Sequence, residues 1–349
     1  MQYKKVCVES FGHELPETIV TSLSLEERLA PIYKKFNLSY GRLEIMTGIR
    51  ERRFWDDGVT PSQASIKAAE KAISKSGIKK EDIGCLLHTS VSRDFLEPAT
   101  ATVVHDSLGL PPTATIFDIS NACLGFINGM VTLANMIELG QIKAGIVVGC
   151  ESSKRLIDTT IYKLLKEPDI TRDKLKLAFA TLTLGSGAVA AVLTHSSLSQ
   201  DGHKLLGGVT RAASQHNDLC RIEADTSFVD LDELPDMHTD YEGVLKNGLK
   251  LAPDTWEATK QEIGWKNSDI DRVFTHQVSA VHSKLLFKTL GLDEAKDFST
   301  VDYLGNIGSV SLPITMAIGI DQGRLNTGDK VAMLGIGSGI VCLMLGLEW

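Results

Sequence analysis

The sequence predicts an α/β protein built from two related halves, and an internal repeat together with a series of short apolar segments supports this fold class. Residues 77–92 (GIKKEDIGCLLHTSVS) and 264–279 (GWKNSDIDRVFTHQVS) are identical at six of sixteen positions without a gap. Weaker matches downstream keep an offset of about 185 residues, which indicates two copies of one unit rather than a solenoid array. Chance similarity is the alternative, and the persistent offset argues against it. We expect halves at residues 1–195 and 196–349.

Local signals predict the elements inside each half. Short apolar runs, which predict buried strands, occur at residues 84–90, 115–119, 145–149, 272–276 and 330–336. A helix should begin at Thr60 and Pro61, a cap followed by proline at the first helical position, and end at Gly77. The polar stretches 152–176 and 212–240 interrupt this pattern, so we expect them to lie over the site as lids or insertions.

Composition excludes several classes of protein. The 349 residues are 43% hydrophobic and 23% charged, enough to bury a full core, so disorder is not expected. The 36 Lys and Arg against 44 Asp and Glu leave a net charge of −8, which argues against nucleic acid or an anionic membrane as the main partner. We find no apolar run long enough to span a membrane. Six cysteines without a Cys-x-x-Cys pair, and no spacing typical of metal ligands, predict a reducing cytoplasm and no metal.

Cys123 lies where a predicted strand gives way to a helix. Apolar residues recur after it at spacings of four, three and four, namely at Phe126, Met130, Leu133 and Ile137, as on one buried helix face. Cys123 should therefore lie at or next to a helix N-terminus, where peptide dipoles and free N–H groups stabilise a thiolate. A cysteine in this position is more often structural than catalytic, so both roles remain open.

The repeat connects Cys123 with a second polar residue. The internal offset superimposes Cys123 on Asn306, so that two related helix N-termini converge on the junction between the halves. His276 ends the repeated strand of the second half, at the carboxyl end where α/β sheets place their sites. A single histidine there would usually be a packing or capping residue. Together, Cys123, His276 and Asn306 are a more specific indication of acyl-transfer chemistry than any of them alone. A thiolate can accept an acyl group, while His and Asn N–H groups can hold a thioester oxygen.

Six short motifs follow one another along the whole chain. They are Thr47–Arg50 (TGIR), Asn121–Gly125 (NACLG), Leu184–Ala188 (LGSGA), His276–Gln277, Gly305–Ser309 (GNIGS) and Gly337–Ile340 (GSGI). Together they resemble the thiolase superfamily, specifically ketoacyl synthase III, also called 3-oxoacyl-(acyl-carrier-protein) synthase III. The resemblance implies a thiolase-like fold of two pseudo-symmetric halves in five αβαβα layers, and no cofactor. It also implies that Cys123 is the acylated nucleophile, that His276 and Asn306 hold the thioester oxygen, and that the Cys123 and Gly339 amides form an oxyanion hole.

Departures from that family indicate a subgroup. The family usually has His-Gln-Ala-Asn where this chain has HQVS at 276–279, and Arg where it has Met46. The segment 93–100 (RDFLEPAT), with HQVS and GNIGS, resembles the OleA condensing enzymes, which join two long-chain acyl-CoA molecules head to head into a β-keto acid. That resemblance implies that Glu97, contributed by the partner in a homodimer, removes the α-proton. Judged by its residue type alone, Glu97 is more commonly a solvated loop glutamate.

The sequence thus predicts a cytoplasmic, homodimeric, cofactor-free acyltransferase that uses acyl-CoA or acyl carrier protein thioesters and condenses two long-chain acyl-CoA molecules without decarboxylation. Three alternatives remain: a decarboxylating synthase that uses a malonyl thioester, an acyl-CoA thioester hydrolase, and a non-catalytic scaffold. Gly185, Gly187 and Ala190 nominally fit a dinucleotide fingerprint, but the chain continues there as a strand, so we expect no bound dinucleotide.

Overall fold

The computed structural model describes residues 1–223 and 236–349. The strands of the first half are β1 (Val6–Glu14), β2 (Thr18–Thr21), β3 (Glu51–Phe54), β4 (Ile83–His88), β5 (Thr115–Asp118), β6 (Ala144–Glu151) and β7 (Gly187–His195). Its helices are α1 (Ser22–Arg28), α2 (Ala30–Phe36), α3 (Arg42–Thr47), α4 (Pro61–Ser76), α5 (Thr100–Leu108), α6 (Gly125–Glu138), α7 (Lys154–Lys166) and α8 (Arg172–Leu182). The second half contains β8 (Lys204–Ala212), β9 (Cys220–Glu223), β10 (Asp236–Thr239), β11 (Arg272–Thr275), β12 (Lys330–Gly337) and β13 (Val341–Glu348), with α9 (Tyr241–Ile263), α10 (Ala280–Leu290), α11 (Val301–Leu304) and α12 (Ser311–Asp321).

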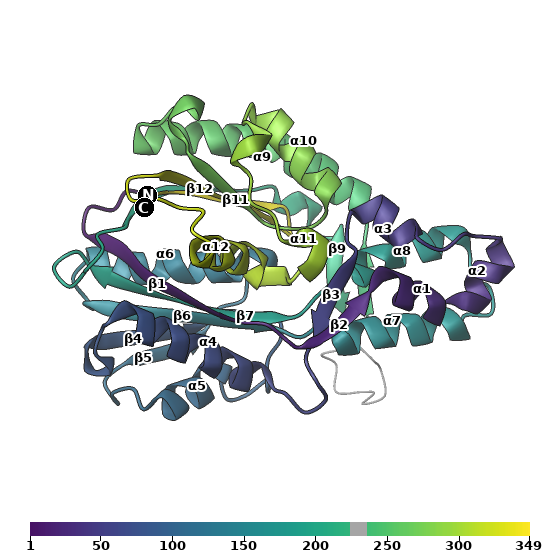
Figure 1. Ribbon diagram of the computed structural model, residues 1–349, viewed down its shortest axis with the longest axis horizontal. Coiled ribbons are helices and arrows are strands. Elements are labelled where there is room, and N and C mark those ends of the chain that lie inside the picture. The colour runs from purple at the N-terminus through teal and green to yellow at the C-terminus, as the bar shows by residue number, and fades with distance from the viewer. Residues whose placement is uncertain (224–235) are drawn as a thin grey trace.

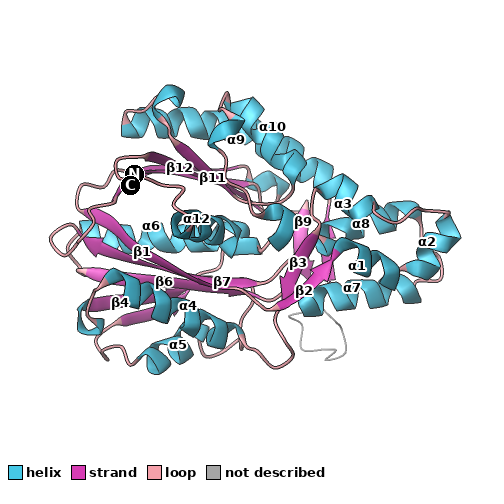
Figure 2. Ribbon diagram, viewed as in Figure 1, coloured by secondary structure: helices cyan, strands magenta, loops and turns pink. Residues whose placement is uncertain are grey.

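Helices and strands alternate in five layers (Figure 1). Nine strands hydrogen-bond in the order β11-β12-β13-β8-β1-β7-β6-β4-β5, but β1 and β8 share only the pair Cys7 and Lys204, so the sheet divides there into two parts. Helices α6 and α12 lie between the two parts of the sheet (Figure 2). Helices α4 and α5 cover the outer face of the part that holds β1, β7, β6, β4 and β5, and α9 and α10 cover the outer face of the part that holds β11, β12, β13 and β8. This is the five-layer arrangement expected from the sequence.

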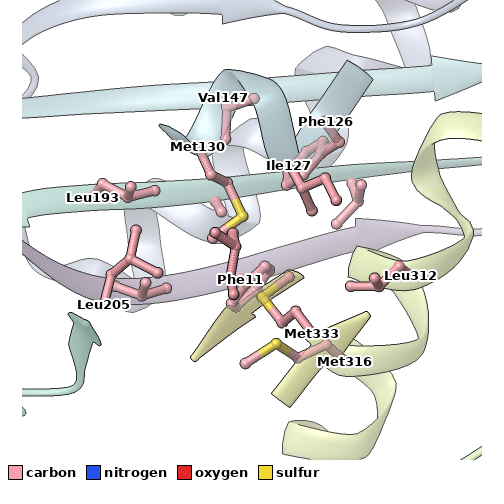
Figure 3. Close-up of a cluster of buried hydrophobic side chains, with 14 of the residues drawn as sticks. Phe11, Phe126, Ile127, Met130, Val147, Leu193, Leu205, Leu312, Met316 and Met333 are labelled. Carbon is pink, nitrogen blue, oxygen red and sulfur yellow. The ribbon is translucent and has the colours of Figure 1, made fainter. Parts of the chain in front are cut away.

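The central layer belongs to one core shared by both halves. Phe126 and Met130 of α6 lie in the same buried cluster as Leu312 and Met316 of α12 and Met333 of β12 (Figure 3). All five side chains are almost completely removed from solvent. Because neither half covers its inner helix alone, we infer that the halves stabilise one another. The division of the chain near residue 195 stays a prediction about domains.

Local signals place α4 where the sequence predicted it. The Thr60 side chain accepts a hydrogen bond from the Gln63 N–H at 3.3 Å, Pro61 is the first helical residue, and Gly77 ends the helix in the left-handed conformation with φ 64°. Strand β7 begins at Gly187, the second glycine of the nominal dinucleotide fingerprint, and no helix opens there, as expected.

The strands that carry the site are mostly parallel. Strand β4 pairs in parallel with β5 and β6, and β11 pairs in parallel with β12. The carboxyl ends of parallel strands meet at one edge of a sheet, which is where ligands bind in such folds. The segments that leave β4, β5, β6, β11 and β12 therefore run toward a common region, and each of them contributes to the site.

The two polar stretches form additions to the layers. Residues 152–176 hold α7 and the start of α8, which pack with α1 and α2 in a separate buried cluster and project to one side (Figure 1). In the stretch 212–240, β9 and β10 pair as a two-stranded ribbon, while residues 224–235 lie outside the described part of the chain. Residues of both additions line the cavity described below, as expected of insertions over the site.

Candidate active site

A cavity of about 1140 Å³ lies where the two halves meet the two additions. Cys123, His276 and Asn306, which are far apart in the sequence, all line it. Its walls also include Met46 of α3, Leu177 of α8 and the following residues of the ribbon and neighbouring segments: Ile222, Met237, Val278 and Ile336. Ligand pockets usually enclose roughly 300–1,000 Å³, so this cavity suits a large and partly apolar ligand.

Cys123 lies in the turn that joins β5 to α6. Residues Ala122–Leu124 form a short 3₁₀ turn, and Ala122 adopts a left-handed conformation with φ 43°, which is uncommon for a residue with a Cβ. Helix α6 begins directly afterwards at Gly125, as predicted. The turn thus presents a half-buried thiol to the cavity from the start of a buried helix.

Main-chain N–H groups at the Cys123 turn favour its thiolate, as expected, but burial of the side chain outweighs them. Burial raises the pKa of the Cys123 thiol to about 12, and the nearby Cys220 and Glu151 raise this pKa further. The main-chain N–H groups of Ser338 and of Cys123 itself act in the opposite direction, but they do not compensate for desolvation. Cys123 therefore rests as a thiol, and a reaction in which its sulfur acts as a nucleophile must also remove this proton.

His276 follows β11 and carries a neutral imidazole. Its main-chain N–H donates to the Leu334 carbonyl at 3.0 Å, which continues the β11–β12 pairing into the cavity wall. Burial lowers the pKa of His276 to about 3, and His282 lowers it further. The buried Nδ1 atom has no hydrogen-bond partner within the described chain. A neutral imidazole bears one N–H, so His276 can donate one hydrogen bond to a ligand oxygen.

Asn306 is held from both sides by the segment after α8. Its N–H donates to the Thr183 carbonyl at 2.9 Å, and its carbonyl accepts from the Gly185 N–H at 2.8 Å. Side-chain Oδ1 accepts from the Gly308 N–H at 3.0 Å, which leaves Nδ2 as the donor toward the cavity. A Cβ on Gly185 would lie 2.1 Å from the Leu304 carbonyl oxygen, so this close approach requires glycine.

The glycine turn after β12 closes on Cys123. A Cβ on Gly337 would lie 3.5 Å from the Cβ of Cys123, and the Ser338 N–H lies near enough to the Cys123 thiol to lower its pKa. Gly339 has φ 77° and is absent from the cavity wall formed by the described residues. The structure thus brings the Ser338 amide to the sulfur, and the role expected of the Gly339 amide stays a prediction.

Glu97 lies apart from these residues within one chain. It is exposed in the loop between β4 and α5, and it does not line the cavity that the described residues enclose. The peptide bond between Glu97 and Pro98 is cis. The neighbouring side chains Phe95 and Leu96 are 45% and 91% exposed. Cys123, His276 and Asn306 are brought together by the fold of one chain, and Glu97 is not.

Glu151 and Cys220 are among the cavity residues that were not predicted from the sequence. Glu151 ends β6 and is buried, and its place at the carboxyl end of a predicted strand was the signal that could have identified it. Cys220 lies in the ribbon, where its Sγ accepts a hydrogen bond from the Ser338 hydroxyl at 3.2 Å, and no local signal marks it. No group of three or more His, Cys, Asp or Glu residues suited to a metal ion occurs in the described residues. None of the described helices is long and apolar enough to cross a membrane.

Comparison with known proteins gives a consistent answer. Residues 117–213 match 3-oxoacyl-(acyl-carrier-protein) synthase III, and residues 261–349 match the C-terminal part of the same family. The acyl-CoA:acyl-CoA alkyltransferase of Shewanella oneidensis is 44% identical over the full length of both chains. The chain belongs to the 3-oxoacyl-(acyl-carrier-protein) synthase III family, in the group of the acyl-CoA:acyl-CoA alkyltransferases.

Other members of this acyltransferase family agree with that assignment. The acyl-CoA:acyl-CoA alkyltransferase of Xanthomonas campestris is 39% identical over the full length of both chains. A crystal structure of Xanthomonas campestris OleA superimposes with a TM-score of 0.93 and covers 100% of this chain and 99% of that one, and a cerulenin-bound OleA structure gives 0.92 with 100% and 98% coverage. The predicted thiolase-like fold and acyltransferase family are confirmed.

Proposed function

We propose that this chain condenses two long-chain acyl-CoA molecules head to head, without decarboxylation, to a β-keto acid. The observation that carries the proposal is the 44% identity over the whole chain to an acyl-CoA:acyl-CoA alkyltransferase. The large cavity lined by Cys123, His276 and Asn306 supports it, because it offers a nucleophile, two donors and room for an acyl chain.

The first step is acyl transfer to Cys123. A bond forms between Sγ and the thioester carbonyl carbon, the bond from that carbon to the CoA sulfur breaks, and CoA leaves with the thiol proton. Because burial raises the pKa of Cys123, loss of this proton belongs to the reaction itself and not to the resting enzyme. The Cys123 and Ser338 N–H groups are suited to the oxyanion that develops, and the Gly339 amide is the alternative donor.

The second step joins the two acyl chains. His276 and the Nδ2 of Asn306 donate to the thioester oxygen of the second acyl-CoA, which stabilises the enolate formed when Glu97 of the partner subunit removes an α-proton. The α-carbon attacks the Cys123 thioester, a C–C bond forms, and the cysteine sulfur leaves and regains a proton. Water then hydrolyses the remaining CoA thioester, so the products are a β-keto acid and free CoA.

The proposed homodimer would supply Glu97 to the cavity. Strand β5 is at the edge of the sheet, and Phe117 on this strand is 36% exposed. Phe95 and Leu96 leave apolar surface next to Glu97 in the sequence, and Phe117 adds exposed apolar surface at the sheet edge, of the kind that a protein interface covers. We place the enzyme in the reducing cytoplasm, in line with its six free cysteines.

The test is mass spectrometry of protein and products after incubation with a long-chain acyl-CoA alone. We expect a Cys123 adduct and a β-keto acid or the ketone formed from it. Both should be absent in Cys123→Ala, and the condensed product alone should be absent in Glu97→Ala. A product that appears only after malonyl-CoA is added would replace the proposal with a decarboxylating synthase. Free fatty acid and CoA alone would indicate a hydrolase, and no adduct with any thioester would indicate a scaffold.

A further inference from the structure

One buried carboxylate binds two active-site segments at once. Glu151 is 6% exposed at the end of β6, and both of its oxygens accept several hydrogen bonds. Its Oε2 accepts from the N–H of Ser92 at 3.1 Å and from the Ser92 hydroxyl at 2.9 Å. Its Oε1 accepts from the Val91 N–H at 3.0 Å and from the Ser309 hydroxyl at 2.5 Å. A fully buried carboxylate with this many donors holds its neighbours in a defined place.

The first of these segments is the turn that orients Asn306. Ser309 follows Gly308, whose N–H fixes Oδ1 of Asn306. A Cβ on Gly308 would lie 3.2 Å from Cγ of Glu151, so the turn lies directly against this side chain. Movement of Glu151 would therefore move the group that decides where Nδ2 of Asn306 points.

The second segment is the loop that carries Glu97. Val91 and Ser92 begin this loop as it leaves β4, and Ser92 also accepts a hydrogen bond from the Ser152 N–H at 2.9 Å. Asp94, two residues on, accepts from the Ser62 N–H at the start of α4. The start of the loop is thus tied to the protein body through Glu151, and Ser152, Ser62 and the Ser309 hydroxyl add further contacts, whereas Glu97 itself is exposed.

We propose that Glu151 is a positioning residue that holds the Asn306 turn and the Glu97 loop of one chain in a fixed relation. Because the proposed function places Glu97 in the partner's cavity, this contact also links the thioester-binding residues of one active site to the base of the other; the proposal rests on that function. Burial raises the pKa of Glu151, while the hydrogen bonds from Ser309, Val91 and Ser92 lower it.

Glutamine cannot replace this carboxylate without releasing one side. The amide has one oxygen, and its NH₂ group would face groups that donate to Glu151, either the Val91 N–H and the Ser309 hydroxyl or the N–H and hydroxyl of Ser92. Two single substitutions disturb the contacts of Glu151 with one segment at a time. Ser309→Ala removes the hydroxyl contact on the Asn306 turn, and Ser92→Ala removes the hydroxyl contact on the Glu97 loop.

The experiment uses mixed dimers of a Cys123→Ala chain and a Glu97→Ala chain, purified with two different tags. Each dimer has one complete site, with Cys123 from one chain and Glu97 from the other. Glu151→Gln is placed in one chain at a time. In the Cys123→Ala chain it can affect the complete site only through the Glu97 loop. In the Glu97→Ala chain it acts within the working cavity, through the Asn306 turn and the cavity wall.

We expect both placements to reduce α-proton exchange and β-keto acid formation by about tenfold to a hundredfold, as for loss of a charged hydrogen bond. Acylation of Cys123 should not fall in either placement, because it needs neither segment and because loss of the Glu151 charge beside Cys123 would lower the pKa of its thiol, not raise it. The matched variants should act on one side only: Ser92→Ala in the Cys123→Ala chain, and Ser309→Ala in the Glu97→Ala chain. If Glu151→Gln does not fold, these two variants carry the test.

Three results would overturn the proposal. Unchanged exchange with Glu151→Gln in the Cys123→Ala chain would show that the Glu97 loop does not depend on it. An equal loss of acylation and condensation would indicate a general structural role. An inactive parent mixed dimer beside an active wild type would show that Glu97 does not act across subunits. Failure of the proposed function is a different result, namely a wild type that forms no condensed product from acyl-CoA alone.

Discussion

Substitution of Asn306 by aspartate would test the thioester-binding role of the side chain without disturbing its support. Oδ1 of Asn306 accepts from the Gly308 N–H at 3.0 Å, and main-chain hydrogen bonds hold the residue on both sides. Aspartate has the same size and keeps this acceptor. It replaces only the Nδ2 donor, by an oxygen that cannot donate when ionised. The perturbation is therefore confined to the group that faces the cavity.

The expected loss follows from this geometry. Removal of one donor from a developing oxyanion reduces the rate by about 10²–10³, or about 2.7–4 kcal/mol. Asn306 is only 9% exposed, so a carboxylate there would also repel an enolate through little solvent. We therefore expect Asn306→Asp to reduce the rate of enolate formation by about 10³, the upper end of that range, and Asn306→Ala to reduce it by about 10². Transfer of the first acyl group to Cys123 does not use this donor and should be nearly unchanged.

Mass spectrometry in D₂O separates the two steps. Deuterium at the α-carbon of recovered acyl-CoA reports enolate formation, the mass of the protein reports acylation of Cys123, and the β-keto acid reports condensation. Thermal melting checks that the variant is folded. The assigned role would be refuted if Asn306→Asp kept more than about a tenth of wild-type exchange, or if acylation fell as far as exchange did.

Three further predictions concern ionisation and stability. Since burial raises the pKa of Cys123 to about 12, its rate of alkylation by iodoacetamide should still rise with pH above pH 9, and a plateau below pH 8 would contradict this. Gly185→Ala places a Cβ 2.1 Å from the Leu304 carbonyl oxygen and should lower the free energy of unfolding by about 1–3 kcal/mol, measured by denaturant unfolding. Condensation should be lost before acylation. A wild-type free energy of unfolding would contradict the close contact. In the same assay, Phe126→Ala should lower the free energy of unfolding by about 3–5 kcal/mol and Thr60→Ala by about 1 kcal/mol. Equal losses would contradict the expectation that the buried core side chain stabilises the protein more than the helix cap does.

Much of the fold was predictable because its signals are local. The helix between Thr60 and Gly77 has a cap, a proline and a left-handed glycine within the segment itself, and these act whatever surrounds it. The turn at Cys123 was predictable for the same reason, from a strand followed by helical spacing. The place of His276 followed from the rule that parallel strands deliver their carboxyl ends to one edge.

The sequence by itself determined the family of the chain and predicted Cys123, His276 and Asn306 as its catalytic residues, since residue type and spacing mark them. Only the tertiary structure decided how these groups behave. Cys123 is a thiol and not a thiolate because distant segments enclose it, and desolvation by those segments outweighs the effect of its own helix terminus. The contacts of Glu151 with the Asn306 turn and the Glu97 loop join residues 158 and 59 positions apart, respectively, which no local pattern can show. Desolvation and hydrogen-bond networks depend on what the whole chain brings together, and for that reason they emerge only when it is folded.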